Sequence, residues 1–174
     1  MKKLIAVMLI LTLVLTVTAG LADPEDMQGK AFPDFTAKTI DGKTFKLSEA
    51  LKTHDLVLIN FWATWCGPCC MEFPYLEAAW EQYSDRVAVI ALSIERSDSV
   101  NVLRKFAKEY GLNFPVGRDE KNQFSKMGGQ YIPTTLILDK EGRVLLVEVG
   151  AKGSMEEFTE LFDSLLQEMN SDEV

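Results

Sequence analysis

Apolar and polar positions along the chain follow two different periods. Two short runs, within residues 55–62 and 87–94, are almost continuously apolar, which predicts strands buried on both faces. Apolar residues three or four positions apart predict helices over 68–83 and 98–110, and a last helix that begins at Ser154. The core faces expected for these helices are Phe73, Leu76, Trp80 and Tyr83, then Val102, Leu103 and Phe106, and finally Phe158, Leu161, Phe162 and Leu165.

Turn residues divide the rest of the chain into shorter elements. Asp41-Gly42 predicts a hairpin between residues 31–38 and 43–47, and a second hairpin joins 134–138 to 143–149. Because buried strands alternate with helices, we predict an α/β fold with a mainly parallel sheet covered on both faces and an antiparallel part at the second hairpin. Shorter elements are expected at 48–52 and 120–127 (helical) and at 115–117 (extended).

The first residues have the features of an export signal. Lys2 and Lys3 precede an apolar run over residues 4–17, and a stretch of small residues ends at Ala22. This pattern predicts either a signal peptide cleaved after Ala22 or a membrane anchor formed by residues 4–22, a stretch long enough to cross a bilayer as a helix. In both cases the positive-inside rule places the remainder of the chain outside the cytoplasm.

Composition and length favour one soluble domain after this segment. The chain has 174 residues and a formal net charge of −8. No basic patch stands out, which argues against a nucleic-acid partner. We expect a polar tether over 23–30, one domain over 31–170 and a tail over 171–174.

The three cysteines lie within five positions, at Cys66, Cys69 and Cys70. A Cys-x-x-Cys pair where a buried strand meets a helix places Cys66 at the helix N-terminus, where free N–H groups and the dipole stabilise a thiolate. Cys66 would then attack a substrate disulfide, and Cys69 would resolve the mixed disulfide. A zinc site would need about four ligands, and the sole histidine, His54, is distant in sequence. We therefore expect redox chemistry and no metal.

The segment from Phe61 to Cys69 (FWATWCGPC) closely resembles the active-site segment of thioredoxins, and the resemblance continues at Ile132-Pro133-Thr134-Thr135. Glu72-Phe73-Pro74 after the cysteine pair and the export signal are similar to the extracytoplasmic TlpA/ResA-like branch. This resemblance implies a three-layer thioredoxin-like fold with a mixed central sheet, an N-terminal β-hairpin extension and a central αβ insertion at about residues 98–117. It also implies a cis peptide bond before Pro133, which packs against a redox-active Cys66–Cys69 disulfide.

Members of that branch reduce disulfides of proteins, including apocytochrome c before haem attachment, and are re-reduced by a transmembrane thiol reductase. The resemblance therefore implies disulfide-bearing protein substrates and a membrane thiol reductase as electron donor. No nucleotide or flavin motif is visible, so we expect no cofactor.

Four residues near the pair complete the expected site. Glu72 borders the buried face of its helix, where a raised pKa would let it exchange a proton with Cys69, although a first-turn glutamate also simply favours the helix dipole. In thioredoxins an aspartate with that proton role stands where this chain has Asn60. Trp65 is expected to offer an apolar surface to a substrate chain, and a cis Pro133 would leave the backbone of Ile132 open to pair with it.

Three other functions stay open. In a thiol peroxidase of the peroxiredoxin type, a proline and a threonine would stand where this chain has Ile59 and Ala63. A copper chaperone would use the Cys66 and Cys70 spacing, but no histidine follows Cys70. An oxidant or isomerase would share the fold, whereas the thioredoxin-like Gly67-Pro68 between the cysteines favours reduction. Cys70 itself is expected to be a bystander thiol.

Overall fold

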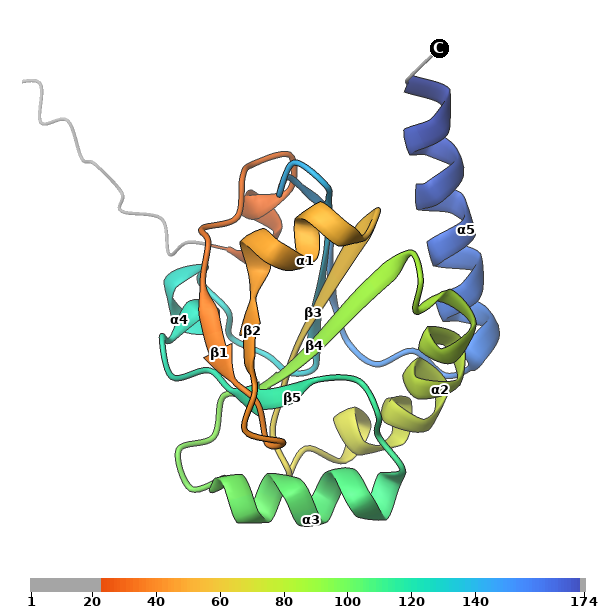
Figure 1. Cartoon of the computed structure of the whole chain (residues 1–174). Helices are drawn as coiled ribbons and strands as arrows, with labels where there is room; N and C mark the ends of the chain where they lie inside the picture. The colour runs from red at the N-terminus through yellow and green to blue at the C-terminus, as the bar shows by residue number, and fades with distance from the viewer. Residues whose placement is uncertain (1–22, 173–174) are drawn as a thin grey trace, which may run out of the picture.

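A five-stranded mixed sheet forms the centre of the computed structural model, which describes residues 23–172 (Figure 1). Its strand order is β5-β4-β3-β6-β7; β4 runs parallel to β3 and β5, and β6 runs antiparallel to β3 and β7. All seven residues of the central strand β3 are buried, as its continuous apolar run predicts. The five strands are β3 (Leu56–Trp62), β4 (Val87–Ser93), β5 (Val116–Arg118), β6 (Thr134–Asp139) and β7 (Val144–Val149).

Helices cover both faces of this sheet. The side chains of Leu56, Leu58 and Trp62 share one core cluster with three helices, α2 (Gly67–Tyr83), α3 (Val100–Tyr110) and α5 (Met155–Asp172). The intervening side chains Val57, Ile59 and Phe61 face the opposite cluster, with two short helices, α1 (Leu47–Thr53) and α4 (Gln123–Lys126). This arrangement confirms the predicted three-layer α/β fold with a mixed sheet, although two of the four strand pairings are antiparallel, so the sheet is not mainly parallel.

The predicted hairpin extension and αβ insertion are both present. Strands β1 (Thr36–Lys38) and β2 (Thr44–Lys46) pair antiparallel and adjoin the main sheet through a bridge between Thr39 and Gly117. A Cβ atom at Gly117 would lie 2.7 Å from the Lys38 carbonyl oxygen, so this close approach requires glycine. The insertion forms α3 and β5, with Gly111 in a left-handed conformation (φ 68°) at the end of α3.

Two of the expected core faces contain their predicted central residues but differ at the edges. In α3 the buried stripe is Leu103, Phe106 and Ala107, whereas Val102 is 43% exposed. In α5 the fully packed side chains are Phe158, Phe162 and Leu166, and the predicted Leu161 and Leu165 lie half-buried at the edge of the stripe. Each element exists as predicted, but the tertiary contact selects which side of the apolar stripe points inward.

Residues 23–30, which were expected to form a polar tether, are folded onto the domain in the structure. A short 3₁₀ helix, η1 (Pro24–Met27), begins after Asp23, whose side chain accepts a hydrogen bond from the Glu25 amide. The Gly29 amide then donates to the Val144 carbonyl, and the Val144 amide donates to the Lys30 carbonyl. The chain therefore joins the fold about eight residues earlier than its polar composition suggests.

The two ends of the chain differ in what the structure describes. Helix α5 continues to Asp172 and so includes half of the expected tail. The predicted signal or anchor lies outside the described residues. Within residues 23–172, no helix combines the length and the hydropathy needed to cross a membrane.

Candidate active site: a disulfide at the N-terminus of α2

The cysteine pair lies where β3 delivers the chain into α2. Cys66 is the N-cap residue of α2, and the Cys69 backbone N–H donates to the Cys66 Sγ over 3.2 Å. The two sulfurs form a disulfide, with Cys66 4% exposed and Cys69 fully buried. The backbone N–H and the helix dipole stabilise negative charge on Cys66, whereas burial among apolar side chains opposes charge on Cys69. The two sulfurs are therefore inequivalent when the disulfide opens.

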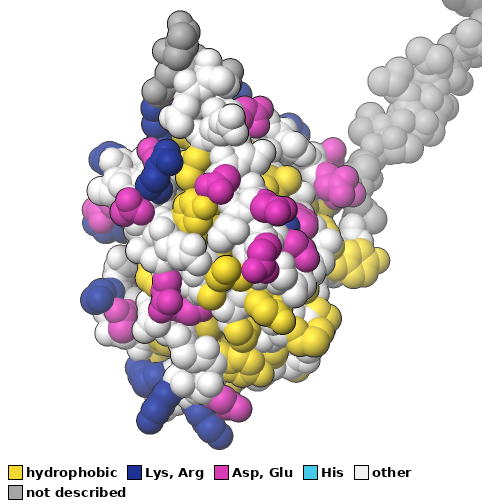
Figure 2. Space-filling model, turned by 90° about the vertical axis from the view of Figure 1, so that its right-hand side faces the viewer, with side chains coloured by type: hydrophobic (Ala, Val, Ile, Leu, Met, Phe, Trp, Pro, Cys, Tyr) yellow, Lys and Arg dark blue, Asp and Glu magenta, His cyan; other side chains and the backbone are white. Residues whose placement is uncertain are grey.

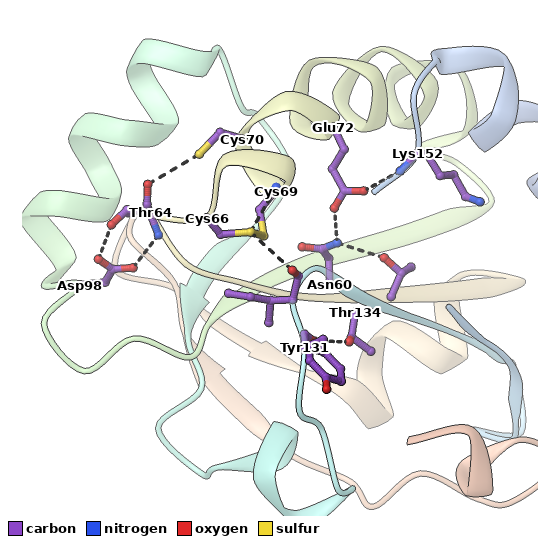
Figure 3. The surroundings of a disulfide bond; sticks show 12 residues. Asn60, Thr64, Cys66, Cys69, Cys70, Glu72, Asp98, Tyr131, Thr134 and Lys152 are labelled. Atoms are coloured by element: carbon purple, nitrogen blue, oxygen red, sulfur yellow. Dashed lines mark hydrogen bonds between the residues drawn. A yellow bond between two sulfur atoms is a disulfide. The ribbon is translucent and has the colours of Figure 1, made fainter. Parts of the chain in front are cut away.

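A loop from the other side of the sheet closes over this pair (Figure 3). The Ile132–Pro133 peptide bond is cis, as the resemblance to thioredoxins implies, and the Ile132 carbonyl oxygen lies 3.7 Å from the Cys66 Sγ. The Thr134 hydroxyl donates to the Tyr131 carbonyl, and the Gly150 amide donates to the Pro133 carbonyl. These two bonds hold the loop against the start of β6.

Glu72, the predicted proton carrier, lies on α2 one turn beyond Cys69 and is 1% exposed. Its Oε1 accepts a hydrogen bond of 2.9 Å from Asn60 Nδ2, and its Oε2 accepts one of 3.2 Å from the Lys152 backbone amide. Burial, opposed by these two hydrogen bonds, raises the pKa of Glu72 from 4.5 to about 7. The carboxyl group can therefore gain or lose a proton near neutral pH, as a proton carrier requires.

A row of polar residues crosses the sheet beneath Glu72. Asn60 on β3 is paired with Thr135 on β6, and Thr135 is paired with Glu148 on β7, so the three side chains share one face. Asn60 Nδ2 also donates to Thr135 Oγ1 over 3.0 Å. At the end of the row, Lys152 Nζ donates to Glu148 Oε2 over 2.5 Å. This polar row connects the buried carboxyl group with the rim of the domain.

The loop before Cys66 is fixed by two acidic residues that follow β4. The buried carboxylate of Asp98 accepts from the backbone N–H and the hydroxyl of Thr64, at 3.1 and 2.6 Å, and from the Ser93 hydroxyl at 2.6 Å. Glu95 Oε2 accepts from the indole N–H of Trp65 at 3.0 Å. Trp65 is 65% exposed, and this hydrogen bond holds its indole ring in one orientation beside Cys66.

Cys70, the third cysteine, is separate from the disulfide. It is half-buried, its thiol donates to the Thr64 carbonyl at 3.6 Å, and burial raises its pKa. A thiol with a raised pKa is a poor nucleophile, which agrees with the expected bystander role. Among the described residues, no group of three or more His, Cys, Asp and Glu side chains could hold a metal ion.

Several apolar side chains on the segments that form the site, and on the adjoining end of β7, are exposed. Trp65, Met71, Tyr75, Tyr131 and Val149 are each between 41% and 70% exposed. Figure 2 shows hydrophobic side chains gathered on the lower part of the face that carries α2 and α5, with acidic side chains above them. The domain thus presents an apolar surface beside its only described disulfide.

Sequence reasoning located part of this site. The structure joins Cys66 to Cys69 and places the carbonyl oxygen of Ile132, next to Pro133, 3.7 Å from the Cys66 sulfur; Glu72 lies one turn beyond Cys69 on α2, and Trp65 directly precedes Cys66. It also adds partners that the sequence did not reveal, namely Thr135 and Lys152 around Glu72, Asp98 and Glu95 around the active-site loop, and Tyr131 on the surface. In the sequence, Asn60 stands out only because thioredoxins have an aspartate at its position.

Comparisons with known proteins agree with this geometry. Residues 28–147 match the model of the AhpC/TSA family. The chain is 37% identical over 137 residues to the thioredoxin-like protein YneN of Bacillus subtilis, covering 77% of this chain and 79% of YneN. It is 38% identical over 135 residues to the thiol-disulfide oxidoreductase ResA of Bacillus thuringiensis, covering 74% of each chain.

A solved structure shares both the fold and part of the sequence. The thiol:disulfide interchange protein of the thioredoxin family from Chlorobium tepidum superposes with a TM-score of 0.69 at 26% identity, covering 79% of this chain and 96% of that one. With its Cys66–Cys69 disulfide at the start of α2, the chain belongs to the AhpC/TSA family and, within it, to the ResA-like thiol–disulfide oxidoreductases.

Proposed function

We propose that this thiol–disulfide oxidoreductase works outside the cytoplasm and in the reducing direction, donating electrons to disulfides of proteins. The inequivalence of the two cysteines carries the proposal: Cys66 receives a backbone N–H at the helix N-terminus, and Cys69 is fully buried. A stabilised thiolate next to a buried thiol is the arrangement that attacks a disulfide and then resolves the product. Gly67-Pro68 between the cysteines, as in thioredoxins, supports the reducing direction.

The reaction takes place in two exchanges. The Cys66 thiolate attacks one sulfur of the substrate disulfide, forming a mixed disulfide and releasing the other substrate sulfur as a thiolate, which takes a proton. Cys69 loses its proton and attacks the Cys66 sulfur, which forms the Cys66–Cys69 bond and passes the electron pair to the remaining substrate sulfur. The substrate gains two electrons and two protons, and the enzyme ends as the disulfide described above.

Glu72 is the proposed acceptor of the Cys69 proton. Its pKa of about 7 means that a substantial fraction is ionised at neutral pH, ready to take the proton when Cys69 attacks. The amide of Asn60 cannot take up a proton, which leaves Glu72 to perform the role that aspartate has in thioredoxins.

Trp65, Ile132 and Pro133 are the proposed substrate-binding residues. The exposed indole of Trp65 offers an apolar contact beside Cys66, and its bond to Glu95 reduces the entropy lost on binding. The Ile132 carbonyl, 3.7 Å from the Cys66 sulfur, supports main-chain pairing with an extended substrate segment. An apocytochrome c with a disulfide between its haem-binding cysteines is one such substrate.

The N-terminal residues support the proposed location, and the motifs of the chain support the proposed electron donor. A positively charged start and a long apolar run direct the domain across the membrane, with the apolar run removed or retained as an anchor. The chain carries no nucleotide-binding motif, so we propose that a transmembrane thiol reductase returns electrons to the Cys66–Cys69 pair.

A thiol peroxidase is the second candidate, because the AhpC/TSA family model covers residues 28–147. Ile59 and Ala63 stand where a peroxidase of that type needs proline and threonine, and both are buried. A copper chaperone is the non-enzymatic alternative, and copper retained through purification would favour it. Copper binding through two thiolates does not need the inequivalence of Cys66 and Cys69, and a peroxidase, which could use it, would lack its proline and threonine.

The reduction potential tests the proposal. The purified protein is equilibrated with dithiol redox buffers, its free thiols are trapped, and the trapped positions are read by mass spectrometry. We expect one two-electron step that joins Cys66 to Cys69, at a potential below about −230 mV, towards the thioredoxin value near −270 mV. A potential between about −120 and −180 mV would instead indicate an oxidant or an isomerase.

A further inference from the structure

Asn60 has an unusual environment in the centre of the sheet. It is fully buried on β3, on the face covered by α2. Its Nδ2 donates to Glu72 Oε1 at 2.9 Å and to Thr135 Oγ1 at 3.0 Å, which uses both amide hydrogens and fixes the orientation of the amide. Because Nδ2 is held on the Glu72 side, the carbonyl oxygen Oδ1 must point the other way.

The Oδ1 atom of Asn60 has no hydrogen-bond partner. Among buried side-chain nitrogen and oxygen atoms of residues 23–172, the indole nitrogen of Trp62 is the other one without a partner, and it is a donor. In Figure 3, Asn60 turns this oxygen toward the Cys66–Cys69 disulfide. A buried acceptor without a donor costs about 1–3 kcal/mol, and a disulfide has no proton to offer it.

Reduction creates the missing donor. When a donor dithiol passes two electrons to the disulfide, the S–S bond breaks and the pair takes up one proton if one sulfur remains a thiolate. The Cys69 N–H and the α2 N-terminus stabilise that thiolate on Cys66. The proton therefore resides on Cys69, which is fully buried and so becomes a buried S–H group in need of an acceptor.

We propose that Asn60 is a redox-linked positioning residue, whose Oδ1 accepts a hydrogen bond from the Cys69 thiol in the dithiol form while its Nδ2 stays bound to Glu72. The inference rests on the proposed Cys66–Cys69 redox reaction and adds a role for the residue that replaces the aspartate of thioredoxins. One amide group then connects the thiol that must lose a proton with the carboxyl group that receives it. Because an amide does not take up protons, Asn60 holds Cys69 as a thiol until a mixed disulfide forms.

Infrared spectroscopy of the S–H stretch tests this hydrogen bond directly. Reduced-minus-oxidised difference spectra of the whole protein cancel the Cys70 thiol, which is present in both forms. At a pH where Cys66 is a thiolate and Cys69 is not, the remaining band belongs to Cys69. We expect this band at lower frequency than that of an unbonded thiol, and we expect Asn60→Leu, which removes Oδ1 at similar volume, to move it to higher frequency.

Thr135→Val is the matched control, because it removes an Asn60 contact but leaves Oδ1 in place. Its Cys69 band should stay at the wild-type frequency. A Cys69 band that Asn60→Leu does not move, or one that Thr135→Val moves equally, would overturn the proposal.

A second measurement needs no variant that alters the core. In wild-type protein labelled with ¹³C at the asparagine side-chain carbonyls, the Asn60 resonance should shift on reduction, while those of Asn101, Asn113, Asn122 and Asn170 serve as references. An unmoved Asn60 resonance also contradicts the inference. If mass spectrometry shows the Cys66–Cys69 dithiol but neither signal changes, only the role of Asn60 fails; if no dithiol forms, the proposed function fails with it.

Discussion

Glu72 carries a carboxyl group into a site where two hydrogen bonds replace its hydration. Burial raises its pKa to about 7, so the folded protein keeps this proton at pH values where the unfolded chain, with a pKa near 4.5, has already lost it. The groups that face it are Asn60 from β3, Lys152 from the β7–α5 loop and Glu148 from β7. Glu148 raises its pKa further, and Lys152 lowers it.

This shift predicts a fold that loses stability as pH rises. Between about pH 4.5 and 7 the folded state binds more protons than the unfolded state, so the free energy of unfolding falls with pH and the loss is complete above pH 7. The expected contribution of Glu72 is on the order of 3 kcal/mol, from 1.36 kcal/mol per pKa unit. Urea unfolding of the disulfide form at pH 5 and pH 8 measures it. Glu72→Gln should remove this part of the pH dependence, and an unchanged slope in the variant would assign the effect to other groups.

Among the elements, the β4–α3 loop has a role that its sequence does not announce. Asp98 reads as the first residue of a helix, but α3 begins at Val100, with Ser99 as its N-cap. Asp98 instead turns back into the protein to hold Thr64 and Ser93. Through Thr64, which lies 34 residues earlier in the chain, Asp98 fixes the loop that leads into Cys66.

Asp98→Ala should therefore destabilise the domain more than its position in a loop suggests. Three donors lose their acceptor, two of them on Thr64, and we expect a loss of about 2–4 kcal/mol in the free energy of unfolding. Asp163→Ala, which removes one exposed bond to Tyr83, is the control and should cost less than 1 kcal/mol. Urea denaturation of both variants in the disulfide form compares them, and equal losses would show that Asp98 does not clamp the loop.

The limits of sequence reasoning are also visible at this scale. Every strand and α-helix of the domain has a predicted counterpart, because buried strands and amphipathic helices leave periodic patterns, but the bounds differ: the strand expected from residue 31 begins at Thr36, and the helix expected from residue 98 begins at Val100. The first folded residues were missed, because this segment is mostly polar: η1 buries only Pro24, and Gly29 and Lys30 are held to Val144 by backbone hydrogen bonds. Cys66, Cys69 and Pro133 could be found from motifs, whereas Thr135 and Lys152 join Glu72 only through strand pairing and a loop distant in sequence.

At the scale of the whole molecule, the disulfide opens onto a surface suited to another protein chain. Both cysteines are almost fully covered, yet apolar side chains beside them are exposed. Acidic side chains lie above this surface in Figure 2, in keeping with the formal net charge of −8 of the chain. A small disulfide compound can bury little of this surface and so gains little binding free energy from it, whereas a peptide can cover it.

Trp65→Ala and Tyr131→Ala should therefore separate large substrates from small ones. Both side chains are at least 65% exposed, so neither change disturbs the core. We expect each to lower kcat/KM for a disulfide-bonded protein by roughly 10-fold, equivalent to about 1.4 kcal/mol. With glutathione disulfide as the electron acceptor, the same variants should match the wild type. An equal loss with both substrates would mean that the aromatic residues act on Cys66 itself.

The polar row of Asn60, Thr135 and Glu148 requires each of these residues to keep its place on the same face of the sheet. Successive residues in a strand face opposite sides, so a one-residue deletion at the start of β6 would put the apolar Leu136 in place of Thr135. Connections away from the cysteine pair and the Ile132–Pro133 loop do not have this two-residue constraint, and an αβ unit, α3 and β5, lies between β4 and β6. Evolution and design can therefore lengthen this domain in connections that do not hold Cys66 or Pro133, whereas inside the strands only changes of two residues at a time would keep a working redox centre.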